Sequence, residues 1–357
     1  MSESTQETRE VPEGFTKVQL GPKFEVVPND WEIKPLSNWL SNLESGGRPK
    51  TSKRSESDSV LSIGGAHISD ESFDLDGPVR ISEAYYEGLN AGKIEEGDIL
   101  LVKDGATIGK STYVNEVPEG RAAVNSHVYI LRVGHKPYDP QFLYNFIKSR
   151  VGLDQILRLK TGTAQAGLNR TFQQATKVLT PPLPEQRRIA DVLSSVDEQI
   201  QQTGEIIEKT KELKRGLMQD LFTGGLNNNK LMSVRLGAKT RKIPQHWEVI
   251  RLGEISDIKR GASPRPIGDD KYFGGDVGWI RISDITQTDS KYVTEPSDRL
   301  SDLGVSESVL IEPETLVLSI SATIGKPAIL QTKSCIHDGI VALRNLRENV
   351  DIEYIYY

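Results

Sequence analysis

The strongest constraint on the fold is an internal duplication of the sequence. VPNDWEIKPL near the start matches IPQHWEVIRL further along, and their tryptophans, Trp31 and Trp247, lie 216 residues apart. GATIGK matches SATIGK, and Ala106 and Ala322 are again 216 residues apart. VYILR then matches IVALR, and YDPQFLYNF matches VDIEYIYY, in the same order. A repeat this long is a domain rather than a solenoid unit, so the sequence predicts two copies of one domain.

Each copy begins with strand-like segments, and a helical segment follows. The runs VLSIGGAHIS, GDILLVKDG, STYVNEV and SHVYILRV are rich in β-branched residues, alternate in part and are separated by Gly, Asp and Pro. PQFLYNFIKSRVGLDQILRL has apolar residues at helical spacing and predicts a helix. The predicted fold class is α+β, with an irregular sheet in each copy.

A different pattern joins the two copies. Between Glu185 and Phe222 there is no proline, and ten positions from Ile189 to Leu221 alternate between spacings of four and three, which predicts one long helix with a heptad seam. The seam is mostly apolar and is softened by Thr203, Thr210 and Lys214. Pro184 stands just before this helix, and Gly224 with Gly225 ends it. The alternative, a core helix of one domain, is disfavoured because such helices are usually much shorter. The seam residues that we expect to contact a partner are Ile189, Leu193, Val196, Ile200, Ile207, Leu217 and Leu221.

These patterns divide the chain into a polar N-terminal tail, a first domain, a spacer helix, a linker and a second domain. Their expected bounds are 1–26, 27–182, 183–223, 224–242 and 243–357. Tyr357 corresponds to the position just after Tyr144, so a counterpart of Asn145–Lys230 is missing. We therefore expect the second domain to be truncated, either as a fragment or in a naturally shortened protein.

Composition narrows the class of protein. No apolar run approaches the roughly 18 residues of a membrane span, and the polar start lacks the core of a signal peptide, so we expect a cytoplasmic protein. Cys335 is the one cysteine, which excludes an intrachain disulfide and a thiolate metal cage. The five histidines lack the spacing of a helical metal site. The net charge of −6 argues weakly against nucleic-acid binding, but local basic patches suffice for phosphate contact.

One segment has part of a nucleotide-binding motif. GATIGKS at Gly105–Ser111 has three residues between its glycines, where a P-loop has four. The second copy replaces the first glycine with Ser321 and the final hydroxyl residue with Pro327. We therefore expect a tight turn between strands here and no bound cofactor.

The duplicated motifs together resemble the specificity subunits of Type I restriction–modification enzymes, over most of the chain from Trp31 onward. The family's recognition domains open with W-[EK]-x-x-x-L and a G-x-x-P turn, continue with G-[AS]-T-I-G, and close with T-G-x-x-Q-x-x-L-N and a proline-rich phrase that ends in E-Q-x-x-I. The matching segments here are Trp31–Leu36 and Trp247–Leu252, Gly46–Pro49 and Gly261–Pro264, Gly105–Gly109, Thr161–Asn169, and Pro181–Ile189.

This resemblance implies a division of labour. Each recognition domain would read one half of a split, asymmetric DNA target, while the helix fixes the separation and docks methyltransferase subunits. Endonuclease–translocase subunits would join them, and S-adenosylmethionine, ATP and Mg would bind to these partners, so the chain itself would be non-catalytic. The alternative is a duplicated scaffold protein whose domains bind protein rather than DNA. The target bases are not evident from the sequence.

Basic residues cluster around the G-x-x-P turn in both copies, where they can neutralise phosphates or bind a guanine edge. The alternative is a solvated charge run, which Glu56 and Asp58 would balance. Gln165 and Asn169 either read adenine or fix the turn before the helix, and we favour the structural role. We also expect the exposed seam to self-associate. The candidate DNA-binding residues are Arg48, Lys50, Lys53, Arg54, Lys259, Arg260, Arg265 and Lys271.

Overall fold

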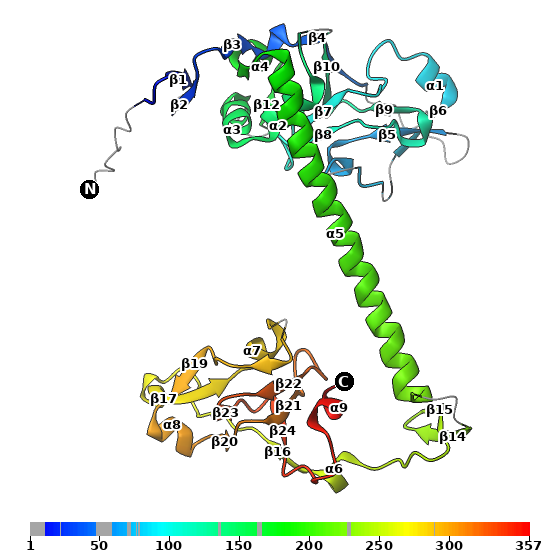
Figure 1. Ribbon diagram of the computed structural model, residues 1–357, viewed down its shortest axis with the longest axis vertical. Helices are drawn as coiled ribbons and strands as arrows, with labels where there is room; N and C mark the ends of the chain where they lie inside the picture. The colour runs from blue at the N-terminus through cyan, green and yellow to red at the C-terminus, as the bar shows by residue number, and fades with distance from the viewer. Residues whose placement is uncertain are drawn as a thin grey trace. The chain divides into compact units, whose positions relative to one another are not determined.

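The computed structural model describes most of the chain as two compact units, Met1–Ile206 and Ile207–Tyr357, with the helix α5 (Leu183–Gly224) crossing the boundary (Figure 1). The described residues are 11–21, 23–47, 59–69, 73–75, 77, 79–134, 137–162, 166–226, 230–288 and 290–357. Helices and strands are mixed in both units, as the α+β prediction requires.

Two sheets form the core of the first unit. The larger has the order β4-β10-β7-β8, antiparallel throughout, and the smaller has the order β6-β5-β9, in which β5 and β9 run parallel. Strand β10 lies between β4 and β7, and its first four residues are buried. The strands are β4 (Leu40–Ser45), β5 (Ser59–Ile63), β6 (Val79–Ser82), β7 (Ile99–Val102), β8 (Ser111–Tyr113), β9 (Ala122–Val124) and β10 (Val128–Val133).

Short elements pack around the two sheets. Helix α1 (Glu83–Glu87) contacts β5 and β6 of the smaller sheet. The core of the larger sheet includes residues of α2 (Pro140–Lys148), α3 (Arg150–Arg158) and α4 (Phe172–Ala175). Two strand pairs are added, β11 (Lys160–Thr161) with β12 (Gly167–Leu168) and β3 (Glu32–Pro35) with β13 (Lys177–Thr180).

The single helix that we predicted after β10 is wrong, because Ser149 divides it into α2 and α3. The Ser149 backbone is extended, its hydroxyl accepts from the Gly152 amide at 3.2 Å, and it donates to the Phe146 carbonyl at 2.6 Å. Ser149 thus ends one helix and caps the next. The hydrophobic spacing continues across the break, so periodicity alone did not reveal it.

The second unit repeats this frame. Its larger sheet has the order β16-β24-β21-β22-β18 and its smaller sheet the order β19-β17-β23-β20, in which β17 and β23 run parallel. Strand β24, like β10, lies between two antiparallel neighbours. The strands are β16 (Asp257–Arg260), β17 (Phe273–Ile280), β18 (Tyr292–Val293), β19 (Asp298–Leu300), β20 (Val309–Ile311), β21 (Thr315–Ser319), β22 (Pro327–Leu330), β23 (Ser334–Ile336) and β24 (Ile340–Arg344).

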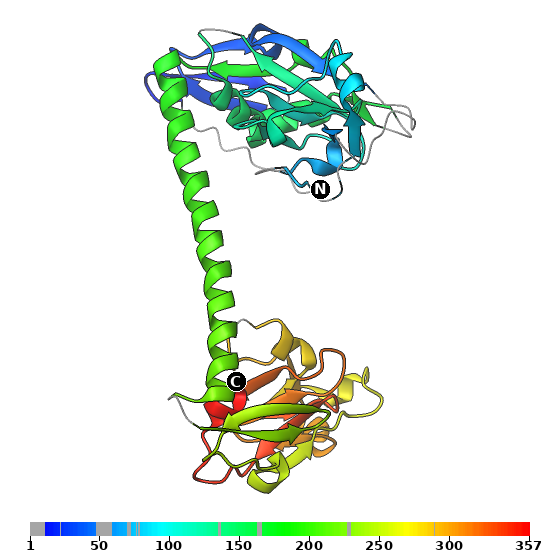
Figure 2. The same ribbon diagram turned by 90° about the vertical axis from the view of Figure 1, so that its right-hand side faces the viewer.

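Four short helices complete the second unit: α6 (Leu252–Ile255), α7 (Ile282–Thr286), α8 (Asp302–Ser306) and α9 (Ile352–Tyr356). Helix α9, drawn in red, packs against β21 and β22 (Figure 2).

A β-hairpin precedes each of the two duplicated domains, which corrects the tail and linker that we expected there. Strands β1 (Phe15–Leu20) and β2 (Lys23–Pro28) pair in the first unit, and β14 (Leu231–Leu236) and β15 (Lys239–Pro244) pair in the second. Gly21 and Gly237 have φ values of +64° and +60°, which favour glycine at the turn. The duplication therefore begins before the tryptophan phrases, and VQLGPK and VRLGAK mark it in the sequence.

The two copies differ in how much apolar surface they bury. Leu20 is 3% exposed and Leu36 is fully buried in the first unit, whereas their counterparts Leu236 and Leu252 are both 43% exposed. In the first unit Leu20 and Leu36 belong to the cluster that includes residues of α3, α4 and β13. The described residues of the second unit contain no equivalent of these three elements.

The long helix α5 has nearly the bounds 183–223 that we expected for the spacer helix. It starts at Leu183, so Pro184 lies in its first turn and not just before it, and it ends at Gly224, after which Gly225 has a φ of +71°. Along the described helix only Gln186 and Ala190 are buried. Ile189 packs on the first core, and the exposed members of the predicted seam are Leu193, Val196, Ile200, Ile207, Leu217 and Leu221. Among the described helices, none has the length and apolar character needed to cross a bilayer.

A buried ion pair ties β7 to β10. Asp98, just before β7, accepts from Nε and Nη2 of Arg132 at 2.8 Å each, and also accepts from the Glu95 amide at 2.8 Å. The Asp98 side chain is 1% exposed and that of Arg132 is 25% exposed. The hydrogen bond with Asp98 raises the pKa of the Arg132 guanidinium. The pair is bidentate and largely desolvated, so the loss of one partner is costly.

We predict that Asp98→Asn destabilises the first unit by about 2–4 kcal/mol, because Arg132 keeps its charge without its closest partner. Urea unfolding of the full chain, followed through the transition of the first unit, measures this loss. Lys23→Ala, which breaks the exposed Lys23–Asp154 pair, is the control and should change the midpoint little. Equal effects of the two substitutions would contradict the argument.

Candidate nucleic-acid interface

The sequence motifs of the first domain meet at one end of its larger sheet. Because the strands are antiparallel, β4 and β7 end where β10 and β8 begin. The β11–β12 pair joins this end, since the Leu168 amide donates to the Lys103 carbonyl at 2.7 Å. We call this the loop end of the first domain, and it consists of Gly46–Gly47, Lys103–Lys110, Asn125–His127 and Gly167–Leu168.

The first glycine of each G-x-x-P turn is required by a close backbone approach. A Cβ atom at Gly46 would lie 1.5 Å from the carbonyl oxygen of Val124, and one at Gly261 would lie 2.2 Å from that of His337. The Gly261 amide also donates to the Ile340 carbonyl at 2.9 Å. In both copies the chain therefore passes against the strand that precedes β10 or β24, and the segment that follows starts at the loop end.

The GATIGK segment forms the tight turn between strands that we predicted. The Val102 amide donates to the Lys110 carbonyl at 2.8 Å and the Gly109 amide donates back to Val102 at 2.9 Å. Gly105 and Gly109 have φ values of +88° and +93°. The turn connects β7 to β8 instead of leading into a helix, whereas a P-loop uses a helix N-terminus to cradle phosphate.

Charged side chains of the first loop end are held in place. His127 Nδ1 lies 2.5 Å from Asp104 Oδ1, and the two side chains are 38% and 23% exposed. Lys103 Nζ lies 3.9 Å from Asp104 and 5.2 Å from the centre of the Tyr129 ring. These contacts order an imidazole and an ammonium group at the place where the motifs meet.

The corresponding end of the second domain brings together two of the predicted basic residues. Arg260 closes β16, and its Nε donates to the Asp338 carbonyl at 2.8 Å. Arg265 Nη2 donates to Asp338 Oδ2 at 2.6 Å. Asp338 lies in the loop before β24, so it organises both arginines. Lys259 is exposed on β16.

Lys271 lies beside a carboxylate of its own. Its Nζ is 3.0 Å from Asp269 Oδ2, and this contact raises the pKa of Lys271 and lowers that of Asp269. Both groups are therefore charged at neutral pH. The neighbouring Tyr272 hydroxyl donates to the Arg265 carbonyl at 2.9 Å, which joins this turn to the arginine segment.

Asn169 has the structural role that we favoured for it. Its Oδ1 accepts from the Thr171 amide at 3.0 Å, just before α4 begins at Phe172. Other predicted residues lie outside the described residues, and these are Arg48, Lys50, Lys53, Arg54 and Gln165.

The opposite end of the first sheet holds the start of α5. Trp31 Nε1 donates to Glu185 Oε2 at 3.1 Å. The buried Gln186 accepts from the Asp139 amide at 2.9 Å and donates to the Pro137 and Pro181 carbonyls at 3.1 and 2.8 Å. These contacts explain why a tryptophan and a Glu-Gln pair occur in the motifs, which sequence reasoning had not assigned. Because Asp139 follows the end of β10, α5 is attached away from the loop end.

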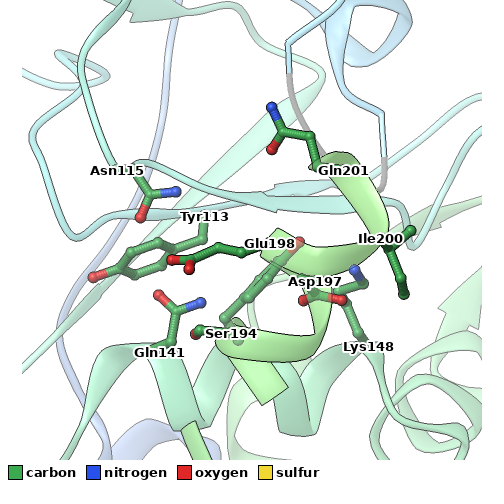
Figure 3. Close-up of a pocket in the computed structure, with 10 residues that line it drawn as sticks. Tyr113, Asn115, Gln141, Lys148, Ser194, Asp197, Glu198, Ile200 and Gln201 are labelled. Carbon is green, nitrogen blue, oxygen red and sulfur yellow. The ribbon is translucent and has the colours of Figure 1, made fainter. Parts of the chain in front are cut away.

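A polar cleft of about 420 Å³ lies where α5 runs past β8 and α2 (Figure 3). Gln141 and Lys148 come from α2, and Asp197 and Glu198 come from α5. Its charges are mixed, and no group of three potential metal ligands was found within the described part of the chain. The cleft offers hydrogen-bonding groups but no constellation for catalysis.

Comparison with protein families identifies one model over most of the chain. The Type I restriction modification DNA specificity domain matches residues 28–212 and 244–357. A putative type I restriction enzyme MjaX specificity subunit of Methanocaldococcus jannaschii is 25% identical over 354 residues, covering 97% of this chain and 78% of that protein. The MjaVIII specificity subunit of the same organism is 28% identical over 247 residues, covering 66% of this chain and about half (51%) of that protein.

Two solved structures have a similar fold. One, from work on complex assembly and conformational transition of the type I R-M system, aligns with a TM-score of 0.57 at 20% identity, covering 92% of this chain and 79% of that chain. The other is a Type-I restriction-modification system S subunit from M. genitalium, with a TM-score of 0.51 at 14% identity, covering 95% and 77%. Both similarities concern the fold alone.

Proposed function

This chain belongs to the Type I restriction–modification DNA specificity family, and from that premise we propose that it reads a bipartite, asymmetric DNA target with its two recognition domains. Specificity subunits of this family are non-catalytic. The observation that supports two different half-sites is the repeated loop end, which has one backbone frame but different charged side chains in the two copies.

The position of the loop ends favours DNA as the ligand. The long helix is attached at the other end of the first sheet, so it does not cover the loop end of that domain. Lys103 is basic there, and the sequence that continues from Gly47 is rich in Arg and Lys. Lys259 and Arg260 occupy the equivalent region of the second copy, together with Arg265, which is paired with Asp338. Such groups release counterions when they meet phosphates, and arginine can also recognise a base edge.

We propose that α5 acts as a spacer and a docking surface. Its 42 residues correspond to a length of roughly 63 Å. The exposed apolar seam suits helices of methyltransferase subunits, to which endonuclease–translocase subunits would then be added. S-adenosylmethionine, ATP and Mg would bind to those subunits. The same proposal places the complex in the cytoplasm, with its DNA.

We predict that replacing Arg48, Lys50, Lys53 and Arg54 with alanine weakens duplex binding and lowers its salt dependence. If all four contact phosphates, the slope of log K against log salt falls by up to about 3.6, because fewer counterions are released. Titration of a labelled duplex at several salt concentrations measures this slope.

The matched control for this experiment replaces Lys209, Lys211, Lys214 and Arg215 on α5, which removes the same charge. A slope that falls equally in both variants would refute the loop assignment. A wild-type chain without salt-sensitive duplex binding would instead favour the duplicated scaffold.

We also predict that the isolated chain self-associates through the seam. Each large apolar side chain left in water costs roughly 1.5–3 kcal/mol, and the same helix of a second copy can cover it about a two-fold axis. Leu193→Glu with Ile200→Glu should break the association, as measured by light scattering. Ser195→Glu with Gln202→Glu adds the same charge at exposed residues on the opposite face of the helix and should preserve it. A wild-type chain that is monomeric at micromolar concentration would exclude this interface.

A further inference from the structure

We infer that Arg265 reads a guanine in one half-site and His127 reads a base in the other, each side chain being held in position by a carboxylate. This inference rests on the proposed function, because it names the groups through which the two loop ends recognise DNA. It is carried by two ion pairs, Arg265–Asp338 and Asp104–His127.

Arg265 is accessible and at the same time oriented. Its side chain is 66% exposed, and one terminal nitrogen, Nη2, is held at 2.6 Å by Asp338 Oδ2. A guanidinium has five N–H donors in a rigid plane, so a contact at one nitrogen aims the others without using them. Orientation before binding reduces the rotamer entropy that a long side chain loses on binding.

Asp338 is itself fixed by contacts from both sides. Its amide donates to Ser263 Oγ at 3.2 Å, and its carbonyl accepts from Arg260 Nε at 2.8 Å. The Arg265 carbonyl accepts from the Tyr272 hydroxyl at 2.9 Å. Both residues of the Arg265–Asp338 pair are therefore held by other parts of the domain. A residue that only binds phosphate would not require such support.

The pairing with a carboxylate distinguishes base reading from phosphate neutralisation. An arginine already balanced by Asp338 adds little net positive charge, so it contributes weakly to attraction of the DNA backbone. Its planar donor fork still matches guanine O6 and N7 in the major groove. Arg265 is therefore suited to specificity more than to affinity.

The first domain places a different group at the same end of the frame. The residue before β10 is His127, whereas the residue before β24 is Gly339, and Asp104 corresponds to Ile320. In the first copy the carboxylate comes from the β7–β8 turn, and in the second it comes from the loop before β24. Equivalent positions of the two domains therefore carry different base-contacting side chains, as an asymmetric target requires.

The Asp104 contact also determines what His127 offers to DNA. A carboxylate only accepts, so Nδ1 of His127 carries the proton that faces Asp104. Nε2 is then the ring nitrogen left to contact a base edge in the major groove. His127 is therefore assigned to one base of the first half-site.

The test is binding-site selection from a pool of randomised duplexes with the full chain, comparing wild type, Arg265→Ala and Arg265→Lys. Both variants should lose the preference for guanine at one position of one half-site, by roughly ten- to hundredfold, and keep the other half-site. Arg265→Lys retains the charge, so its salt dependence should equal that of wild type. Arg347→Ala, which changes an exposed arginine after the end of β24, is the control and should keep the wild-type sequence preference.

His127→Ala should alter one position of the other half-site only, and Asp338→Asn should weaken the same guanine preference that Arg265 controls. Unchanged selection by the Arg265 variants, or an equal loss of affinity for all sequences, overturns the assignment of Arg265. Unchanged selection by His127→Ala overturns the assignment of His127. If the wild-type chain enriches no sequence, the proposed function itself fails, which is a different result.

Discussion

In each domain, the direction of one central strand determines at which end of the sheet the neighbouring loops lie. Strands β10 and β24 each run between two antiparallel neighbours, and the first four residues of β10 are buried. The chain therefore enters these strands at the loop end and leaves them at the other end. In the first domain Gln186 attaches α5 to the backbone just beyond that exit. Strand direction thus keeps the attachment point of α5 and the loop end at opposite ends of the first sheet.

The sequence revealed the features that are periodic or repeated. The duplication, the long helix and the turn at Gly105–Lys110 follow from spacing, proline-free length and glycine placement, and the structure contains all three. It did not reveal the break at Ser149, because a serine cap acts through its hydroxyl while the apolar spacing continues. The hairpins β1–β2 and β14–β15 were missed because their strands are short and largely exposed, so they lack a buried apolar face.

The candidate site was predictable as a region and not as a set of contacts. Basic residues in Ser263–Lys271 were recognised from composition. The role of Asp338 was not, because its loop lies more than 70 residues from Arg265 in the sequence. His127 was not singled out among the five histidines, because its partner Asp104 is distant in sequence and only the sheet brings them together. Contacts between residues that are far apart in the sequence thus distinguish two domains with the same backbone fold. Such contacts leave no local sequence pattern.

The central claim is that two domains read two half-sites whose separation is set by α5. Inserting seven residues after Gln202 keeps the seam in register and lengthens the helix by roughly 10 Å, about three base pairs of duplex. Binding-site selection with the lengthened full chain tests this claim most directly. The account predicts the same two half-sites with a longer spacer between them. Altered half-sites with an unchanged spacer would contradict it.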